Sequence, residues 1–114
     1  HAAGDQVLRH VAQVLGEEIR AGDTVARLGG DEFVLLFPGL QDKAQLTGIA
    51  SRIIQRLSQP IPYGGQECRI SCSIGTVLSG DYAAPDITVM MADADEALYQ
   101  AKREGRGCHR FLRR

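Results

Sequence analysis

Residues 24–37 read Thr-Val-Ala-Arg-Leu-Gly-Gly-Asp-Glu-Phe-Val-Leu-Leu-Phe, two short apolar runs joined by Gly29-Gly30-Asp31-Glu32. Apolar, β-prone runs favour strands and paired glycines favour a tight turn, so this stretch predicts a β-hairpin with strands over residues 24–28 and 33–37. Glycine has no Cβ, which lets the phosphates or ribose of a ligand approach the turn closely. Adjacent carboxylates beside that opening supply hard oxygen ligands for Mg²⁺. From spacing alone, an ordinary solvated hairpin remains the alternative.

Apolar residues at regular spacing outside the hairpin predict further helices and strands. The helices are expected over residues 5–20, 42–58 and 86–104, and the strands over residues 61–63, 67–78 and 108–112. Asp5 is a candidate N-cap of the first helix, and Gly22 is a candidate C-cap. Hairpins interleaved with helices favour an α+β fold with a mostly antiparallel central sheet flanked by helices.

The composition is that of one small globular domain. The chain has 114 residues, of which 44% are hydrophobic and 24% charged, and this suffices for one core. No apolar run approaches the ~20 residues of a membrane span and no basic-then-apolar leader opens the chain, so neither segment is expected here. Aromatic residues make up 5% and the net charge is −1, which argues against binding of a nucleic-acid polymer.

Cysteine usage and charge distribution give two further expectations. The three cysteines, Cys68, Cys72 and Cys108, form neither a CxxC pair nor an even set, which fits a reducing, cytoplasmic location and structural roles. Residues 102–114 carry a net charge of +5, against −6 for residues 1–101. Arginine, which is suited to contacts with phosphate or guanine, provides eleven of the thirteen basic residues. A solvated basic tail is the alternative explanation.

Four motifs follow one another along nearly the whole chain. They are His1-Ala2-Ala3-Gly4-Asp5-Gln6-Val7-Leu8, the hexapeptide Leu28–Phe33, Ser73-Ile74-Gly75, and Ala92–Lys102 followed by Gly105-Arg106. In this order they resemble the GHxxGDxxL, GGDEF, SIG and ADxALYxAKxxGR motifs of the GGDEF family, the diguanylate cyclase domains that join two GTP molecules into cyclic di-GMP. The resemblance implies a ferredoxin-like, nucleotidyl-cyclase palm fold.

The resemblance also implies roles for individual residues. Asp31 is similar to the family residue that binds Mg²⁺ and helps to deprotonate the attacking 3′-hydroxyl, and Glu32 is similar to the second acid of the metal site. The residues expected to contact the substrate are Asp5, Gly29, Gly30, Lys102 and Arg106. Asp5 would accept hydrogen bonds from the guanine edge. Lys102 and Arg106 would hold the triphosphate, and positions four apart on a helix share a face, so both side chains can converge on one anion.

A second group resembles the site at which the family binds its product. Arg20-Ala21-Gly22-Asp23 has the RxxD spacing, with five residues between Asp23 and Gly29. An Arg fork can contact guanine O6 and N7, while Asp can accept from the ring N–H and amino group. Arg52 on the predicted second helix is expected to be the additional arginine that a partner domain lends to this inhibitory site. The alternative for Arg20 and Asp23 is a helix-terminal Arg followed by a turn Asp.

The chain departs from the family pattern at its start. The family carries an upstream strand and helix with another metal-binding Asp and a guanine-binding Asn, whereas this chain begins at His1. We therefore expect residues 1–114 to be a GGDEF domain without its first strand and helix, excised from a longer protein and inactive by itself.

Three functional hypotheses follow from these motifs. The first is a diguanylate cyclase that acts as a homodimer with Mg²⁺ and is inhibited by its product. The second is a non-catalytic module that binds cyclic di-GMP or GTP and regulates an attached signalling domain such as a phosphodiesterase. The third is a dimerisation domain with vestigial motifs.

Overall fold

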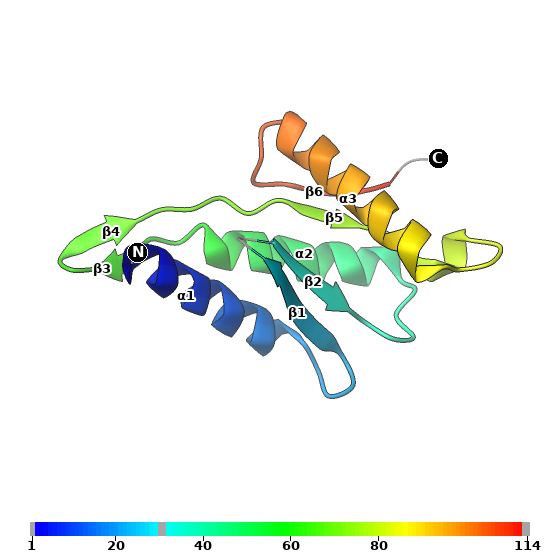
Figure 1. The fold of residues 1–114 in the computed structure, drawn as a ribbon, viewed down its shortest axis with the longest axis horizontal. Helices are drawn as coiled ribbons and strands as arrows, with labels where there is room; N and C mark the ends of the chain where they lie inside the picture. Colours follow the sequence, from blue (N-terminus) through cyan, green and yellow to red (C-terminus); the bar gives the residue numbers. More distant parts are fainter. Residues whose placement is uncertain (1, 30–31, 113–114) are drawn as a thin grey trace.

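Helices and strands follow one another along the chain in the predicted order, except that one expected strand is divided in two (Figure 1). The computed structural model describes residues 2–29 and 32–112. Its elements are α1 (Ala2–Glu18), β1 (Thr24–Gly29), β2 (Glu32–Leu36), α2 (Lys43–Leu57), β3 (Ile61–Tyr63), β4 (Gln66–Cys68), β5 (Ile74–Thr76), the short 3₁₀ turn η1 (Ser79–Asp81), α3 (Ile87–Arg103) and β6 (His109–Phe111). The predicted α+β class is therefore confirmed.

Aspartate caps decide where α2 and α3 begin. The Asp42 carboxylate accepts hydrogen bonds from the backbone N–H groups of Ala44 and Gln45, and Asp86 does the same for Thr88 and Val89. Each cap satisfies backbone donors that have no partner within the first helical turn. Both helices consequently start within one residue of the expected position. Their last residues also lie within one residue of the expected ends.

The first helix differs from its predicted boundaries. Asp5 lies inside the first turn of α1 rather than at its N-cap, because helical backbone already begins at Ala2. The helix ends at Glu18, before the predicted residue 20. The chain turns there because the Asp23 carboxylate accepts a hydrogen bond of 2.8 Å from the backbone N–H of Arg20. Gly22, with φ +94°, occupies the turn instead of capping the helix directly.

The described strands form three two-stranded sheets, so the central sheet differs from the expectation. β1 pairs antiparallel with β2, and β3 pairs antiparallel with β4. β5 pairs with β6 in parallel. The strand expected over residues 67–78 is interrupted at residues 69–73, because its first part pairs with β3 and its last part with β6. Alternating residues predict extended backbone, but they do not identify the partner strand.

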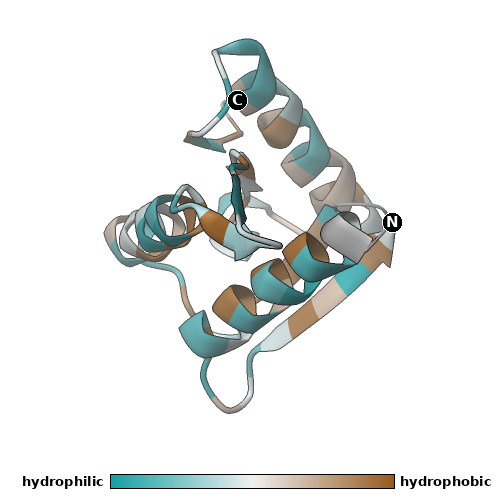
Figure 2. Ribbon diagram, turned by 90° about the vertical axis from the view of Figure 1, so that its left-hand side faces the viewer, coloured by the Kyte–Doolittle hydropathy of each residue, from teal (hydrophilic) through white to brown (hydrophobic). Residues whose placement is uncertain are grey.

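The main core lies between the two N-terminal helices and the hairpin. Val14 and Leu15 of α1 meet Ile53 and Leu57 of α2, and each of the four side chains is at most 4% exposed. Partly buried residues that surround this cluster include Val25, Phe33, Leu35, Ile70, Cys72 and Ile74. Figure 2 shows that apolar and hydrophilic residues alternate along α1, so one face of this helix supplies the core.

A second contact packs α3 against the β5–β6 pair (Figure 1). Ala97 and Ala101 are completely buried there. At Gly75 of β5, an added Cβ would lie only 2.2 Å from the backbone nitrogen of Leu98. Glycine is therefore required at this position because the helix backbone occupies the space of a side chain. Among the described residues, no helix combines the length and apolar character that a bilayer crossing requires.

Candidate functional site

Gly29 ends β1 beside the turn of the hairpin. Its φ of +148° is a backbone conformation that side-chain-bearing residues rarely adopt, and an added Cβ would meet no atom of a described residue within 4 Å. A register shift between Arg27 and Gly29 places Gly29 opposite Glu32, which is exposed at the start of β2. Gly30 and Asp31, the other predicted residues of this turn, lie outside the described residues.

Charged side chains predicted to contact the substrate are left without ion-pair partners. Asp5 in α1, Glu32 in β2, Lys102 in α3 and Arg106 form no ion pair with any other described residue. Asp5, Glu32 and Arg106 are exposed and Lys102 is half-buried. An anionic or polar ligand would not have to break an existing salt bridge to reach any of them.

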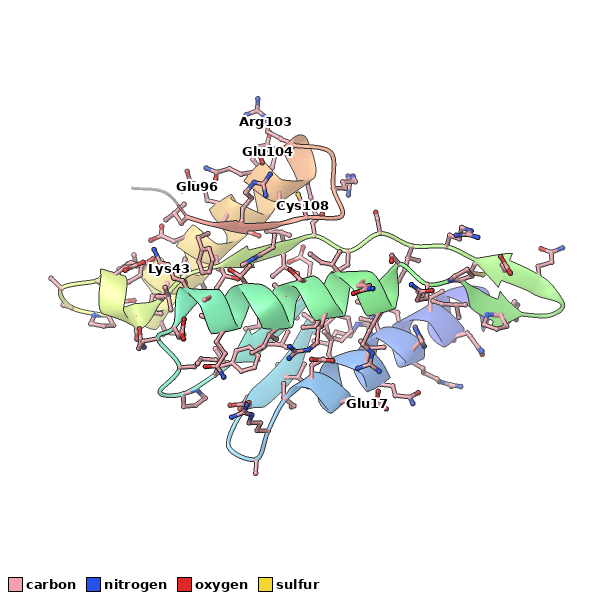
Figure 3. The ribbon with its side chains drawn as sticks, turned by 180° about the vertical axis from the view of Figure 1, so that it is seen from behind. Glu17, Lys43, Glu96, Arg103, Glu104 and Cys108 are labelled. Carbon is pink, nitrogen blue, oxygen red and sulfur yellow. The ribbon has the colours of Figure 1, made fainter. Side chains whose placement is uncertain are left out.

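The end of α3 corrects the predicted relation between the two basic residues. The helix ends at Arg103, so Arg106 is not one helical turn beyond Lys102. Arg106 instead has φ +64° and lies between Gly105 and Gly107, which also have positive φ. Its backbone N–H donates to the carbonyl of Ala101 at 3.2 Å, which folds the chain back over the helix end. Figure 3 shows Arg103, Glu104 and Cys108 around this turn.

Glu32 is the carboxylate at this end of the hairpin that the structure describes, and its side chain is exposed. Among residues 2–29 and 32–112, no group of three or more His, Cys, Asp or Glu side chains is arranged to enclose a metal. Mg²⁺ is usually held by one or two carboxylates together with substrate phosphates, rather than by a cage of protein ligands. The exposed Glu32 carboxylate beside the open Gly29 backbone suits that arrangement.

The predicted inhibitory residues lie around one cavity of about 550 Å³. Glu18, Arg20, Asp23 and Arg52 line it, together with the loop that follows β2 and one side of α2. The structure therefore brings Arg52 from α2 next to the RxxD segment after α1. One Asp23 oxygen is occupied by the backbone N–H of Arg20, while the Arg20 guanidinium has no ion-pair partner among the described residues.

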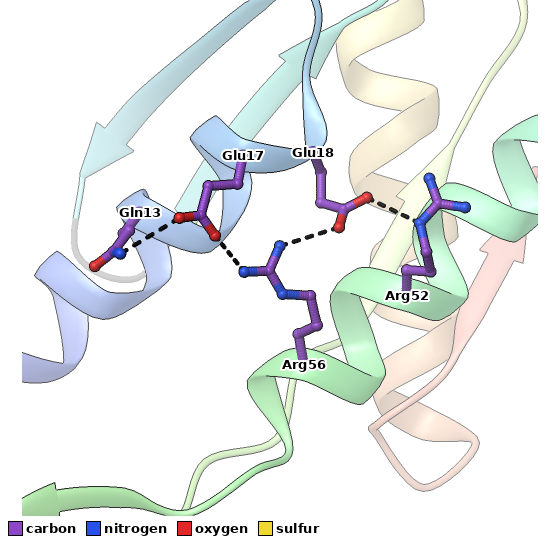
Figure 4. A network of polar contacts seen from close by, with 5 residues as sticks. All are labelled: Gln13, Glu17, Glu18, Arg52 and Arg56. Carbon is purple, nitrogen blue, oxygen red and sulfur yellow. Dashed lines mark hydrogen bonds and ion pairs between the residues drawn. The ribbon is translucent and has the colours of Figure 1, made fainter.

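An ion-pair network that sequence reasoning missed borders this cavity (Figure 4). Glu18 accepts hydrogen bonds of 3.0 Å from both Arg52 and Arg56, and Glu17 is hydrogen-bonded to Arg56 and Gln13. The hydrogen bond from Arg56 lowers the pKa of Glu17, and hydrogen bonds to Glu17 and Glu18 raise the pKa of Arg56. Each arginine of the network lies more than 30 residues from the glutamate that it contacts, and only the contact between Gln13 and Glu17 is local. Residue spacing in the sequence therefore does not predict the network.

Cys72, His109 and Asp93 are at least partly buried and pack within the fold. The three cysteines are free, and burial raises the pKa of the Cys72 thiol to about 11, which keeps it protonated and unreactive. His109 Nε2 lies 2.7 Å from the hydroxyl of Thr76 across the β5–β6 pair. Burial, and secondarily the charge of Arg110, lowers the pKa of His109. The buried Asp93 accepts a hydrogen bond from the Tyr82 hydroxyl, which ties the segment before α3 to that helix.

Known proteins resemble the chain in sequence and in fold. The chain is 42% identical over 113 residues to the "bifunctional diguanylate cyclase/cyclic di-GMP phosphodiesterase" MucR of Pseudomonas aeruginosa, covering 98% of the chain and 16% of MucR. It superimposes with a TM-score of 0.91 on a solved GGDEF domain of TpbB from P. aeruginosa, with 38% identity, covering 99% of the chain and 66% of that structure.

A solved structure with bound nucleotide has a similar fold. The GGDEF domain of DgcB from Caulobacter crescentus, in complex with c-di-GMP, matches with a TM-score of 0.91 and 28% identity, covering 98% of the chain and 66% of that domain. The chain spans 14% to 26% of the lengths of three curated relatives that it matches. A family profile described as "Diguanylate cyclase, GGDEF domain" matches residues 1–108. The chain belongs to the GGDEF family.

Proposed function

We propose that this chain is the larger part of a diguanylate cyclase domain, which condenses two GTP molecules into cyclic di-GMP and pyrophosphate. The observation that carries the proposal is the family match over residues 1–108, in which both glycines and both acids of the Gly29-Gly30-Asp31-Glu32 signature are intact. Asp5, Lys102 and Arg106 support it, because none of them forms an ion pair with another described residue, which leaves each charge available to a nucleotide.

Each proposed residue has a distinct task in the reaction. Asp5 accepts hydrogen bonds from the guanine edge, Lys102 and Arg106 neutralise and orient the triphosphate, and Gly29 with Gly30 leaves room for the nucleotide. Asp31 and Glu32 hold the metal, and Asp31 also helps to remove the proton of the 3′-hydroxyl. Bound Mg²⁺ would supply neutralisation of phosphate charge. Catalysis therefore rests on positioning and electrostatic stabilisation, as in other phosphoryl transfers.

The reaction requires two copies of the domain. The 3′-oxygen of one GTP attacks the α-phosphorus of the other, the bond from that phosphorus to pyrophosphate breaks, and a second identical step closes the ring. With one GTP held per domain, both steps need two domains facing each other. We therefore propose a homodimer as the active form and a larger protein with further signalling domains as its context.

Product binding is the second part of the proposal. We place cyclic di-GMP at the cavity lined by Arg20, Asp23 and Arg52, where it acts as a feedback inhibitor. The guanidinium groups of Arg20 and Arg52 and the Asp23 carboxylate, which line a cavity of about 550 Å³ together with Glu18, provide donors and an acceptor for guanine edges and phosphates.

A test of the cyclase supplies GTP and Mg²⁺ to the protein expressed at its full natural length and measures cyclic di-GMP. Asp31→Asn should abolish product formation. Glu96→Gln, an exposed acid on α3 with no ion-pair partner among the described residues (Figure 3), should leave it unchanged. Absence of product from a verified unmutated dimer would sink the cyclase proposal.

The alternative is a regulatory module that binds the nucleotide without turning it over. One observation favours it: a relative from Escherichia coli, 40% identical over 107 residues and matched over 16% of its length, is named only as the "Cyclic di-GMP phosphodiesterase PdeR". Binding of cyclic di-GMP without any synthesis, together with a nucleotide-dependent change in an attached domain, would identify this function. Arg20→Ala tests whether the product site is separate from the catalytic site. It should weaken product binding and relieve inhibition while synthesis continues.

A further inference from the structure

Glu18 is the central residue of the network between α1 and α2. Its side chain is only 10% exposed. Oε1 accepts a hydrogen bond from Nε of Arg52, and Oε2 accepts one from Nη1 of Arg56, both at 3.0 Å (Figure 4). Both carboxylate oxygens are therefore engaged by arginines from α2, although Glu18 itself ends α1.

The contact with Glu18 uses the inner part of the Arg52 guanidinium. Glu18 binds Nε, and among the described residues neither Nη atom of Arg52 has a hydrogen-bond partner. The Arg52 side chain remains 58% exposed, and the residue lines the same cavity as Arg20 and Asp23. The fork that can recognise phosphate or guanine is thus free while the base of the guanidinium is fixed.

Gly48 keeps the space beside that guanidinium open. An ideal Cβ built on Gly48 would lie 4.0 Å from Nη1 of Arg52, already at ordinary contact distance. Gly48 lies inside α2, where glycine is less favourable than alanine. A side chain larger than a methyl group would compete for the position that Arg52 occupies.

We propose that Glu18 is a positioning residue of the product site: it holds the Arg52 guanidinium over Gly48 so that both Nη atoms are presented to the cavity. This inference rests on the proposed binding of cyclic di-GMP there. A long side chain that is already ordered loses less conformational freedom when the ligand binds, so pre-orientation strengthens binding without a direct contact.

The negative charge of Glu18 disfavours binding of an anionic ligand, whereas its positioning of Arg52 favours binding. The two effects predict opposite results when Glu18 is replaced, which makes the proposal testable. A carboxylate near an anionic ligand repels it, and its removal would strengthen binding if charge were decisive. Here Glu17 and Glu18 are balanced by Arg52 and Arg56, so the repulsion is largely neutralised. Positioning should therefore dominate at Glu18. At Glu17, which pairs with Arg56 but not with Arg52, only the charge effect should appear.

The experiment measures the dissociation constant of cyclic di-GMP for the full chain by titration calorimetry, well below the melting temperature of every variant. Glu18→Ala should weaken binding about tenfold, equivalent to about 1.4 kcal/mol. Glu18→Gln retains an acceptor for Nε of Arg52 and should restore most of the affinity. Glu17→Ala should bind as tightly as the unmutated chain, or more tightly.

A second variant tests the position of Arg52 without changing any charge. Gly48→Val adds methyl groups beside Nη1 and should also weaken binding, whereas Gly48→Ala should not. Unchanged or tighter binding by Glu18→Ala overturns the inference, as does an equal loss in Glu17→Ala or an unaffected Gly48→Val. If the unmutated chain itself does not bind cyclic di-GMP, the proposed product site is wrong and the inference fails with it. If the unmutated chain binds and only the variants behave differently from the expectation, the positioning role of Glu18 alone is wrong.

Discussion

Replacing Gly75 with alanine tests the packing of α3 against β5. The added methyl group would lie 2.2 Å from the Leu98 nitrogen and 2.4 Å from the Ala94 carbonyl oxygen. Ordinary contacts begin at 3.4 Å, so the shortfall at Leu98 is 1.2 Å, and the obstructing atoms are backbone that cannot rotate away. The helix must move back, which also separates the fully buried Ala97 and Ala101 from their neighbours. We expect a loss of about 3 kcal/mol or more.

Thermal unfolding followed by far-UV circular dichroism measures this loss. For a domain of this size a loss of about 3 kcal/mol lowers the melting temperature by roughly 12 °C. Gly16→Ala is the matched control, because Gly16 is exposed in α1 and an added Cβ meets nothing within 4 Å. That control should gain about 0.5–1 kcal/mol from helix propensity. If Gly75→Ala melts within a few degrees of the unmutated chain, α3 does not pack on β5 as closely as described.

Three further changes have defined outcomes. Asp86→Ala removes the cap of α3 and should lower stability by about 1 kcal/mol in urea denaturation, and an unchanged midpoint would show that the cap contributes nothing. Because burial lowers the pKa of His109 below 6.5, the unfolded state binds more protons between that lowered pKa and 6.5, so stability should fall as the pH falls through this window. His109→Gln should remove this part of the pH dependence, and an identical profile would exclude His109 as its source. Arg106→Gly relieves the positive φ and should raise stability by about 0.5 kcal/mol while weakening GTP binding. A loss of stability would contradict the view that Arg106 is strained in this conformation.

Local signals in the sequence predicted the helices and the hairpin well. Asp42 and Asp86 are caps whose partners lie two or three residues away, so the sequence contains the whole interaction. The hairpin of β1 and β2 was predicted for the same reason, since its strands are separated only by Gly30 and Asp31. The family motifs indicated which residues to examine for a nucleotide site.

Features that depend on distant partners could not be predicted in this way. The interruption at residues 69–73 follows from β4 and β5 pairing with different strands, which alternation in one segment does not encode. Arg106 was expected to share a helix face with Lys102, but Gly105 and Gly107 allow a run of positive φ that reverses the chain. Glu18 had no recognisable motif, because its role arises from arginines 34 and 38 residues away.

The parallel pairing of β5 with β6 through α3 makes residues 74–111 a βαβ unit that is continuous in sequence. Such contiguous units open and close cooperatively, and amide hydrogen exchange detects this as a common opening free energy. Lys102 belongs to this unit, whereas Gly29 belongs to the hairpin that packs on α1 and α2. A GTP molecule held by both would tie the two parts together, so that exchange across α3 slows when the nucleotide binds. Nucleotide binding would then be detectable as slower hydrogen exchange at backbone amides that do not contact the ligand.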